Sequence, residues 1–98
     1  MMDNNLFTKV AFDDLKLDFV TKERVIRETF VTIDGQQFEV EDLYETINMI
    51  ESGNAYVTDY GMGKMLVKYG VLSSAGSMNW PGSIGPNYEA FVKMLEKH

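Results

Sequence analysis

The chain has no cysteine, only two prolines and a single histidine, and two of these shortages exclude whole classes of chemistry. Without thiols, a protein has no disulfides, thiolate metal sites or cysteine nucleophiles. The one histidine is His98, the last residue of the sequence, where we expect fraying to prevent the fixed geometry that a catalytic base requires. We therefore expect no catalytic residues, no metal site, no cofactor and no enzymatic activity.

Long apolar runs and basic residues are also scarce. No run approaches the roughly 18 residues of a membrane-spanning helix, and the first residues lack the basic and apolar regions of a secretory signal. The net charge is −6, and residues 1–51 hold 12 acids against 5 bases, whereas residues 52–98 hold 3 acids against 4 bases. We therefore expect a cytoplasmic protein without membrane contact, repelled by phosphate backbones and attracted to basic surfaces.

The strongest local signal in the sequence is the Asp-Gly dipeptide at 34–35, which lies between two alternating apolar segments. Such a dipeptide predicts a two-residue type I′ turn, because both central positions need positive φ. The turn sets the register, so Val31 faces Phe38, and two residues further from the turn Thr29 faces Val40. One face of the predicted hairpin then carries the apolar side chains of Val31, Ile33, Phe38 and Val40.

Three later segments have the apolar spacing of helices. The first covers about 42–52, with Asp42 as its expected N-cap, and the second runs from about 59 to Gly70. The third begins near Pro86, which we expect at the first helical position. A two-stranded ribbon is only marginally stable alone, so we expect the apolar face of the hairpin to be buried against these helices.

These elements predict a single compact domain over residues 1–98 with an α+β fold, in which about three helices pack against an antiparallel hairpin. Residues 15–20 are a candidate third strand, after a short helix or turn that ends at Asp14. The strand expected over 25–33 is long enough to leave an exposed edge, so homodimerisation through that edge stays open as an alternative.

Residues 73–85 are rich in small and turn-forming residues, and no regular structure is expected there. Irregular segments of this length are uncommon in compact domains and are often functional. The segment contains the only tryptophan, Trp80, together with Met78 and Ile84. Large aromatic side chains and methionines on a loop are typical anchors of protein interfaces. The alternative is that Trp80 folds back over the core as a lid.

Two nucleic-acid or nucleotide interpretations are weaker. The glycines and lysine of residues 61–64 do not complete the phosphate-loop pattern, because the first glycine and the following Ser or Thr are missing. Residues 42–72 have the outline of a helix-turn-helix unit, and a glycine-rich segment follows where a winged helix has its wing. However, the second helix offers only Lys64 and Lys68, and no arginine follows Arg27, so direct nucleic-acid binding is disfavoured.

The function that the sequence favours is a small acidic protein-binding module, an inhibitor or adaptor that occludes a larger partner with a basic surface. Small acidic proteins encoded by phages or mobile elements often act in this way on nucleic-acid-handling enzymes, an analogy of size and charge alone. A compact helix-turn-helix-like DNA-binding regulator is the alternative. We expect partner binding through acids of the first half and apolar side chains of the later segment: Asp13, Asp14, Asp18, Glu39, Glu41, Met78, Trp80 and Ile84.

Overall fold

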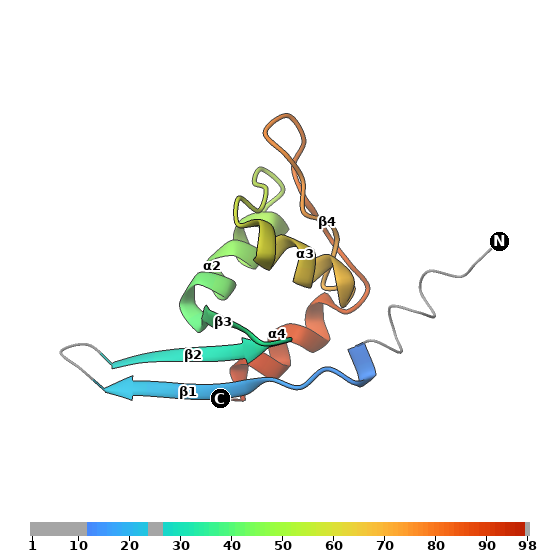
Figure 1. The fold of residues 1–98 in the computed structure, drawn as a ribbon. Helices are drawn as coiled ribbons and strands as arrows, with labels where there is room; N and C mark the ends of the chain where they lie inside the picture. Colours follow the sequence, from blue (N-terminus) through green and yellow to red (C-terminus); the bar gives the residue numbers. More distant parts are fainter. Residues whose placement is uncertain (1–11, 24–26, 98) are drawn as a thin grey trace.

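The computed structural model describes residues 12–23 and 27–97 and has the predicted α+β fold (Figure 1). Parts of three predictions lie outside these residues, namely the helical segment before Phe12, the start of the long strand at Val25, and His98. In Figure 1 the strand ribbon lies at one end of the molecule, and a narrow hairpin projects beyond the helices at the opposite end.

The N-terminal strands form one antiparallel sheet in the order β1-β2-β3. Strand β1 covers Asp18–Glu23, β2 covers Arg27–Ile33, and β3 covers Gln36–Glu39. The predicted third strand is therefore confirmed, with bounds three residues later than expected at each end. Because β3 is shorter than β2, the outer half of β2 pairs with β1 alone, and the two strands continue as a ribbon beyond β3 (Figure 1).

The turn between β2 and β3 confirms the type I′ prediction. Asp34 and Gly35 have φ angles of 54° and 78°, and Val31 lies opposite Phe38 as expected. An aspartate tolerates this left-handed conformation better than most residues do. The apolar face is buried against the helices, with relative exposures between 0% and 8% for Val31, Ile33, Phe38 and Val40.

Two details at the end of β3 were predicted wrongly. Thr29 does not face Val40, because the strand ends at Glu39 and the chain turns directly into helix α2 (Val40–Glu51). Asp42 is consequently inside the first turn of α2 instead of capping it, and the capping position is taken by Glu39, which makes no side-chain capping bond. Starting the helix earlier keeps Val40 in the core, since it becomes the first residue of the buried helix face.

Helix α3 (Tyr60–Lys68) has clear signals at both ends. The carboxylate of Asp59 accepts a 3.0 Å hydrogen bond from a backbone N–H of the first turn, as an N-cap does. At the other end, Gly70 has a φ of 71°, and the N–H of Val71 donates to the carbonyl of Leu66 at 2.9 Å. These features form a Schellman motif and confirm Gly70 as the left-handed residue that terminates the helix after Lys68.

The segment predicted to be irregular is a β-hairpin instead. Strand β4 (Leu72–Ser74) pairs antiparallel with β5 (Ser83–Ile84), and a bridge between Ser77 and Trp80 closes the tip. The strands are too short and too irregular in register to produce an alternating apolar pattern. We refer to residues 72–84 as the 72–84 hairpin.

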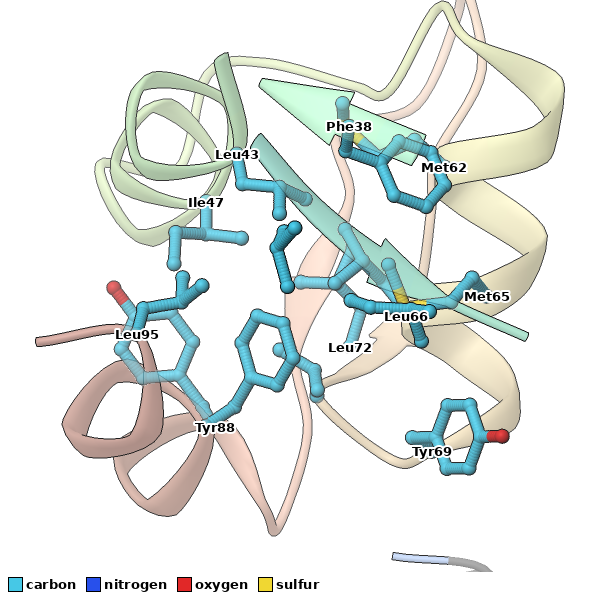
Figure 2. Packing of buried hydrophobic residues seen from close by; sticks show 14 of the residues in the cluster. Phe38, Leu43, Ile47, Met62, Met65, Leu66, Tyr69, Leu72, Tyr88 and Leu95 are labelled. Atoms are coloured by element: carbon cyan, nitrogen blue, oxygen red, sulfur yellow. The ribbon is translucent and has the colours of Figure 1, made fainter. Parts of the chain in front are cut away.

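Helix α4 (Tyr88–Glu96) follows the 72–84 hairpin and completes the core. Pro86 lies before the helix and not at its first position, because Asn87 occupies the N-cap position. The side-chain amide of Asn87 instead donates a 2.9 Å hydrogen bond to the carbonyl of Tyr69, which ties α4 to the end of α3. Figure 2 shows side chains from α2, α3, α4, the β1-β2-β3 sheet and strand β4 meeting in one apolar cluster, among them Phe38, Leu43, Ile47, Met65, Leu66, Leu72, Tyr88 and Leu95.

Candidate functional site

The tip of the 72–84 hairpin exposes two large apolar side chains. Ser77 and Trp80 exchange backbone hydrogen bonds of 2.7 and 3.1 Å, which places Met78 and Asn79 at the very end of the hairpin. Met78 is 82% exposed and Trp80 is 73% exposed. Trp80 therefore does not cover the core as a lid, because most of its side chain is exposed. The hairpin that carries it projects beyond the helices (Figure 1).

The hairpin is fixed to the connection between α2 and α3 by its backbone. The N–H of Val57 donates to the carbonyl of Ala75, and the N–H of Gly82 donates to the carbonyl of Ala55, both at 2.8 Å. Gly76, with a φ of 77°, allows the two sides of the hairpin to approach so closely that a Cβ there would lie 2.5 Å from the backbone nitrogen of Gly82. The tip is thus held in a defined position.

A hollow of about 220 Å³ lies between the hairpin tip and the connection that precedes α3, and we name it the tip hollow. Its apolar walls come from Tyr56, Met78, Trp80 and Pro81. Ile84, the third predicted apolar contact, lies in β5 at the base of the hairpin and is 46% exposed. The structure therefore brings Met78 and Trp80 together at the tip, while Ile84 lies apart from them.

Tyr56 also lines a second hollow, of about 360 Å³, between the outer side of α2 and the segment that leads into α3. Its apolar walls include Met49, which is 51% exposed, and the buried Met62. Three carboxylates also line it, those of Asp42, Glu45 and Asp59, and none of its lining residues is a lysine or arginine. We name this feature the acidic hollow.

The five acids predicted to bind a partner line neither of these two hollows. Asp13 and Asp14 are exposed in the helical turn before β1, and Asp18 is the exposed first residue of that strand. Glu39 and Glu41 lie where β3 joins α2. A helix of 12 residues is about 18 Å long, and the hairpin tip projects beyond the far end of α2 (Figure 1). The structure does not bring these five acids together with the hairpin tip.

The surroundings of Glu39 change its titration. Partial desolvation, followed by the nearby carboxylates of Asp42, Glu28 and Glu41, raises the pKa of Glu39 above its usual value. Repulsion of this kind indicates a concentration of negative charge around the β3–α2 junction. That charge continues along α2 towards the acidic hollow through Asp42 and Glu45.

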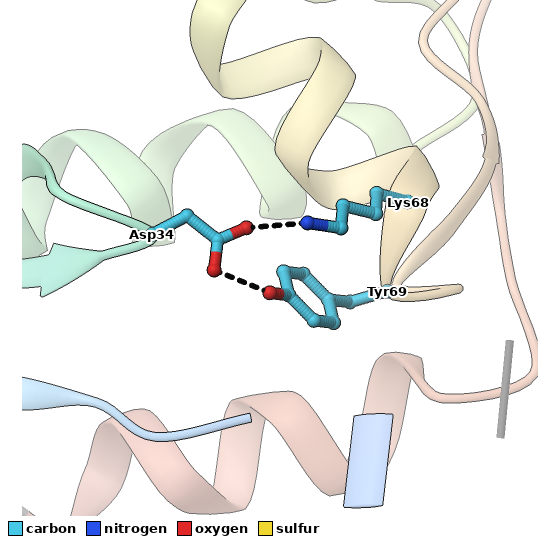
Figure 3. A network of polar contacts seen from close by, with 3 residues as sticks. All are labelled: Asp34, Lys68 and Tyr69. Atoms are coloured by element: carbon cyan, nitrogen blue, oxygen red, sulfur yellow. Dashed lines mark hydrogen bonds and ion pairs between the residues drawn. The ribbon is translucent and has the colours of Figure 1, made fainter. Parts of the chain in front are cut away.

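A polar cluster fastens the β2–β3 turn to the end of α3 (Figure 3). The carboxylate of Asp34 accepts a 2.9 Å hydrogen bond from Lys68 and a 2.5 Å hydrogen bond from the phenol of Tyr69. These two interactions, that of Tyr69 being the larger, hold the pKa of Asp34 below its usual value. Lys68 is therefore engaged within the protein, which leaves Lys64 as the more available lysine of α3.

Sequence reasoning did not single out Met49 and Tyr56 as surface residues, because Met49 fits the flank of a buried helix stripe and Tyr56 lies in a short connection. A signal was nevertheless present. Asp42, Glu45 and Met49 are spaced i, i+3, i+7, which places them on one side of a helix. The position of Tyr56 opposite that side depends on the fold and is not contained in any local pattern.

Within the described ranges, no group of three or more His, Cys, Asp or Glu residues is placed to hold a metal ion. No helix in those ranges is long and apolar enough to cross a membrane. Comparison with protein-family models, with curated proteins and with solved structures gave no match to this chain. The case for a function therefore depends on the geometry and charge of the surfaces described above.

Proposed function

We propose that this chain is a small, acidic, non-enzymatic protein-binding module, an inhibitor or adaptor that occludes a basic surface of a larger partner. The 72–84 hairpin is its principal contact element, with Trp80 and Met78 as apolar anchors. The observation that carries this proposal is the exposure of both side chains, 73% and 82%, at the end of a hairpin whose backbone is bonded to the α2–α3 connection.

The hairpin tip combines exposed apolar side chains with an ordered backbone. Large apolar side chains exposed together gain free energy when a partner covers them. A tryptophan contributes much buried area with few rotatable bonds, so little conformational entropy is lost on binding. Because the tip hollow separates Trp80 and Met78 from the α2–α3 connection, an apolar side chain of a partner has a concave surface to enter.

Charge supports a basic partner. The net charge is −6, and the acids of α2 and the β3–α2 junction lie on the body from which the hairpin projects. Such a field accelerates association with positively charged surfaces and disfavours negatively charged ones. In this proposal Asp13, Asp14, Asp18, Glu39 and Glu41 steer the partner over a distance, and the hairpin makes the close contact.

The test is affinity capture of the partner from nuclease-treated extract of the source cells, with wild type, Trp80→Ala and Tyr60→Ala compared. Tyr60 is a matched control because it is 82% exposed, belongs to α3 and does not line the tip hollow. We expect one stoichiometric protein, held less tightly at high salt, whose recovery falls about tenfold or more with Trp80→Ala. Equal recovery by Trp80→Ala and wild type would contradict the proposal.

The order of elements favours one second candidate, a DNA-binding regulator. Helices α2 and α3 followed by the 72–84 hairpin have the order of a helix-turn-helix with a wing. No charged residue occurs between Lys68 and Glu89, however, so the hairpin offers no cation to a phosphate backbone. Fluorescence anisotropy with labelled duplex DNA tests this candidate, which requires salt-sensitive binding that Lys64→Glu abolishes.

A further inference from the structure

The acidic hollow is suited to a single long cationic side chain. Met49 and Tyr56 supply exposed apolar walls, and the buried Met62 adds a third. Lysine and arginine side chains bury their aliphatic stems along apolar surfaces while their charged ends stay near polar groups. The aromatic ring of Tyr56 adds a favourable surface for a cation.

The charges at the acidic hollow select for a cation. Asp42 lies in the first turn of α2 and Asp59 caps α3, so the positive ends of the two helix dipoles offset part of their charge. Glu45 is further along α2 and makes no hydrogen bond or ion pair with the described residues. Its negative charge is therefore the least offset of the three.

The tip hollow and the acidic hollow share Tyr56. The two hollows are therefore neighbours. We propose that the partner inserts a lysine or arginine side chain into the acidic hollow, with Glu45 as its main ion-pair partner. A neighbouring apolar side chain of the same segment packs against Trp80 and Met78. This inference rests on the proposed function and specifies the chemistry of the partner's contact segment.

Two peptides provide the probes, acetyl-Leu-Gly-Gly-Lys-amide and the same peptide with glutamine in place of lysine. Each is titrated into the full ¹⁵N-labelled chain, and amide shifts at Glu45 and Thr58, which line the acidic hollow alone, report on that hollow. The single indole N–H signal of Trp80 reports on the hairpin tip independently. We expect the lysine peptide to move both sets of signals and to bind about tenfold more tightly than the glutamine peptide.

Glu45→Gln and Glu41→Gln form a matched pair, because both remove one carboxylate from α2 but only Glu45 lines the acidic hollow. We expect Glu45→Gln to weaken the lysine peptide about threefold to fivefold, and Glu41→Gln to have a smaller effect. Equal affinity for the two peptides, or equal effects of the two variants, would overturn the inference.

The outcomes separate this inference from the proposed function. If the Trp80 indole signal moves equally with both peptides, the apolar anchor stands and the cationic contact is overturned. If neither peptide moves the indole signal, the apolar anchor is contradicted as well. Sedimentation of the free protein adds a further outcome, since self-association that Trp80→Ala abolishes would make a second copy the occupant and overturn the inference.

Discussion

The carboxylate of Asp34, in the β2–β3 turn, accepts a 2.5 Å hydrogen bond from the phenol of Tyr69, which directly follows α3. Lys68 donates to the other carboxylate oxygen at 2.9 Å. The same aspartate also provides the left-handed conformation that the turn requires. Asp34 therefore fixes the geometry of the β2–β3 turn. It also attaches the β2–β3 hairpin to the end of α3, one of the helices that support the candidate site.

We predict that Tyr69→Phe lowers the free energy of unfolding by about 1 kcal/mol, because it removes a hydrogen bond to a charged acceptor while keeping the buried ring. Urea denaturation followed by circular dichroism measures the change. Tyr60→Phe is the control, since that side chain is 82% exposed and should be nearly neutral. Equal effects of the two substitutions would show that the Asp34 contact does not stabilise the fold.

Alkaline pH should destabilise the protein through Tyr88. Burial, followed by the hydrogen bond and charge of Glu51, raises the pKa of Tyr88 from 10.0 to about 12. A raised pKa means that the neutral phenol contributes its full stabilisation below pH 10.0 and loses it as the pH rises through about 12.

We therefore expect the free energy of unfolding to fall across this interval, and to fall less in Tyr88→Phe, which cannot ionise. Denaturant titrations at pH 8 and at several values above pH 10 measure the difference. If the free energies of unfolding of the wild type and of Tyr88→Phe changed in parallel with pH, the role given to Tyr88 would be wrong.

Gly76 and Gly35 offer a matched test of how tightly the 72–84 hairpin is built. Their φ values are 77° and 78°, so alanine suffers similar backbone strain at either position. A Cβ on Gly35 meets nothing within 4 Å, whereas a Cβ on Gly76 lies 2.5 Å from the nitrogen of Gly82. We predict that Gly76→Ala costs about 1–3 kcal/mol more than Gly35→Ala in unfolding experiments. Equal costs would mean that the hairpin is looser than its backbone contacts imply.

Trp80 should be nearly irrelevant to stability. Because its side chain is 73% exposed, we predict that Trp80→Ala changes the free energy of unfolding by less than about 0.5 kcal/mol. Phe91, which is fully buried, is the contrast, and Phe91→Ala should cost about 3–5 kcal/mol. Iodide should quench the Trp80 fluorescence of the folded and unfolded protein to similar extents. Strong protection in the folded state would instead indicate a lid.

Much of the fold was predictable because its signals are local. The Asp34-Gly35 turn, the register between Val31 and Phe38, and the end of α3 at Gly70 each depend on one or two residues with special backbone preferences. The start of α2 was less predictable, because Asp42 is a good capping residue but the burial of Val40 outweighs that preference.

The 72–84 hairpin and the acidic hollow could not be predicted, for a different reason. The hairpin depends on close backbone approaches at Gly76 and Gly82 and on hydrogen bonds to the α2–α3 connection, which leave no periodic pattern in the sequence. The acidic hollow depends on Tyr56 lying opposite α2 across a connection whose path the fold determines. The identities of Trp80 and Met78 pointed to an interface, but their exposure became known only from the structure.

The most direct test of the central claim is photo-cross-linking from the hairpin tip. A photoreactive phenylalanine derivative replaces Met78 in one variant and Tyr60 in another, two positions that are each 82% exposed, and each variant is irradiated in extract of the source cells. We predict one discrete protein adduct from position 78, lost when Trp80→Ala is combined with it, and none from position 60. An adduct from position 60 alone would contradict the claim that the hairpin tip binds the partner, as would an adduct from position 78 that is indifferent to Trp80→Ala.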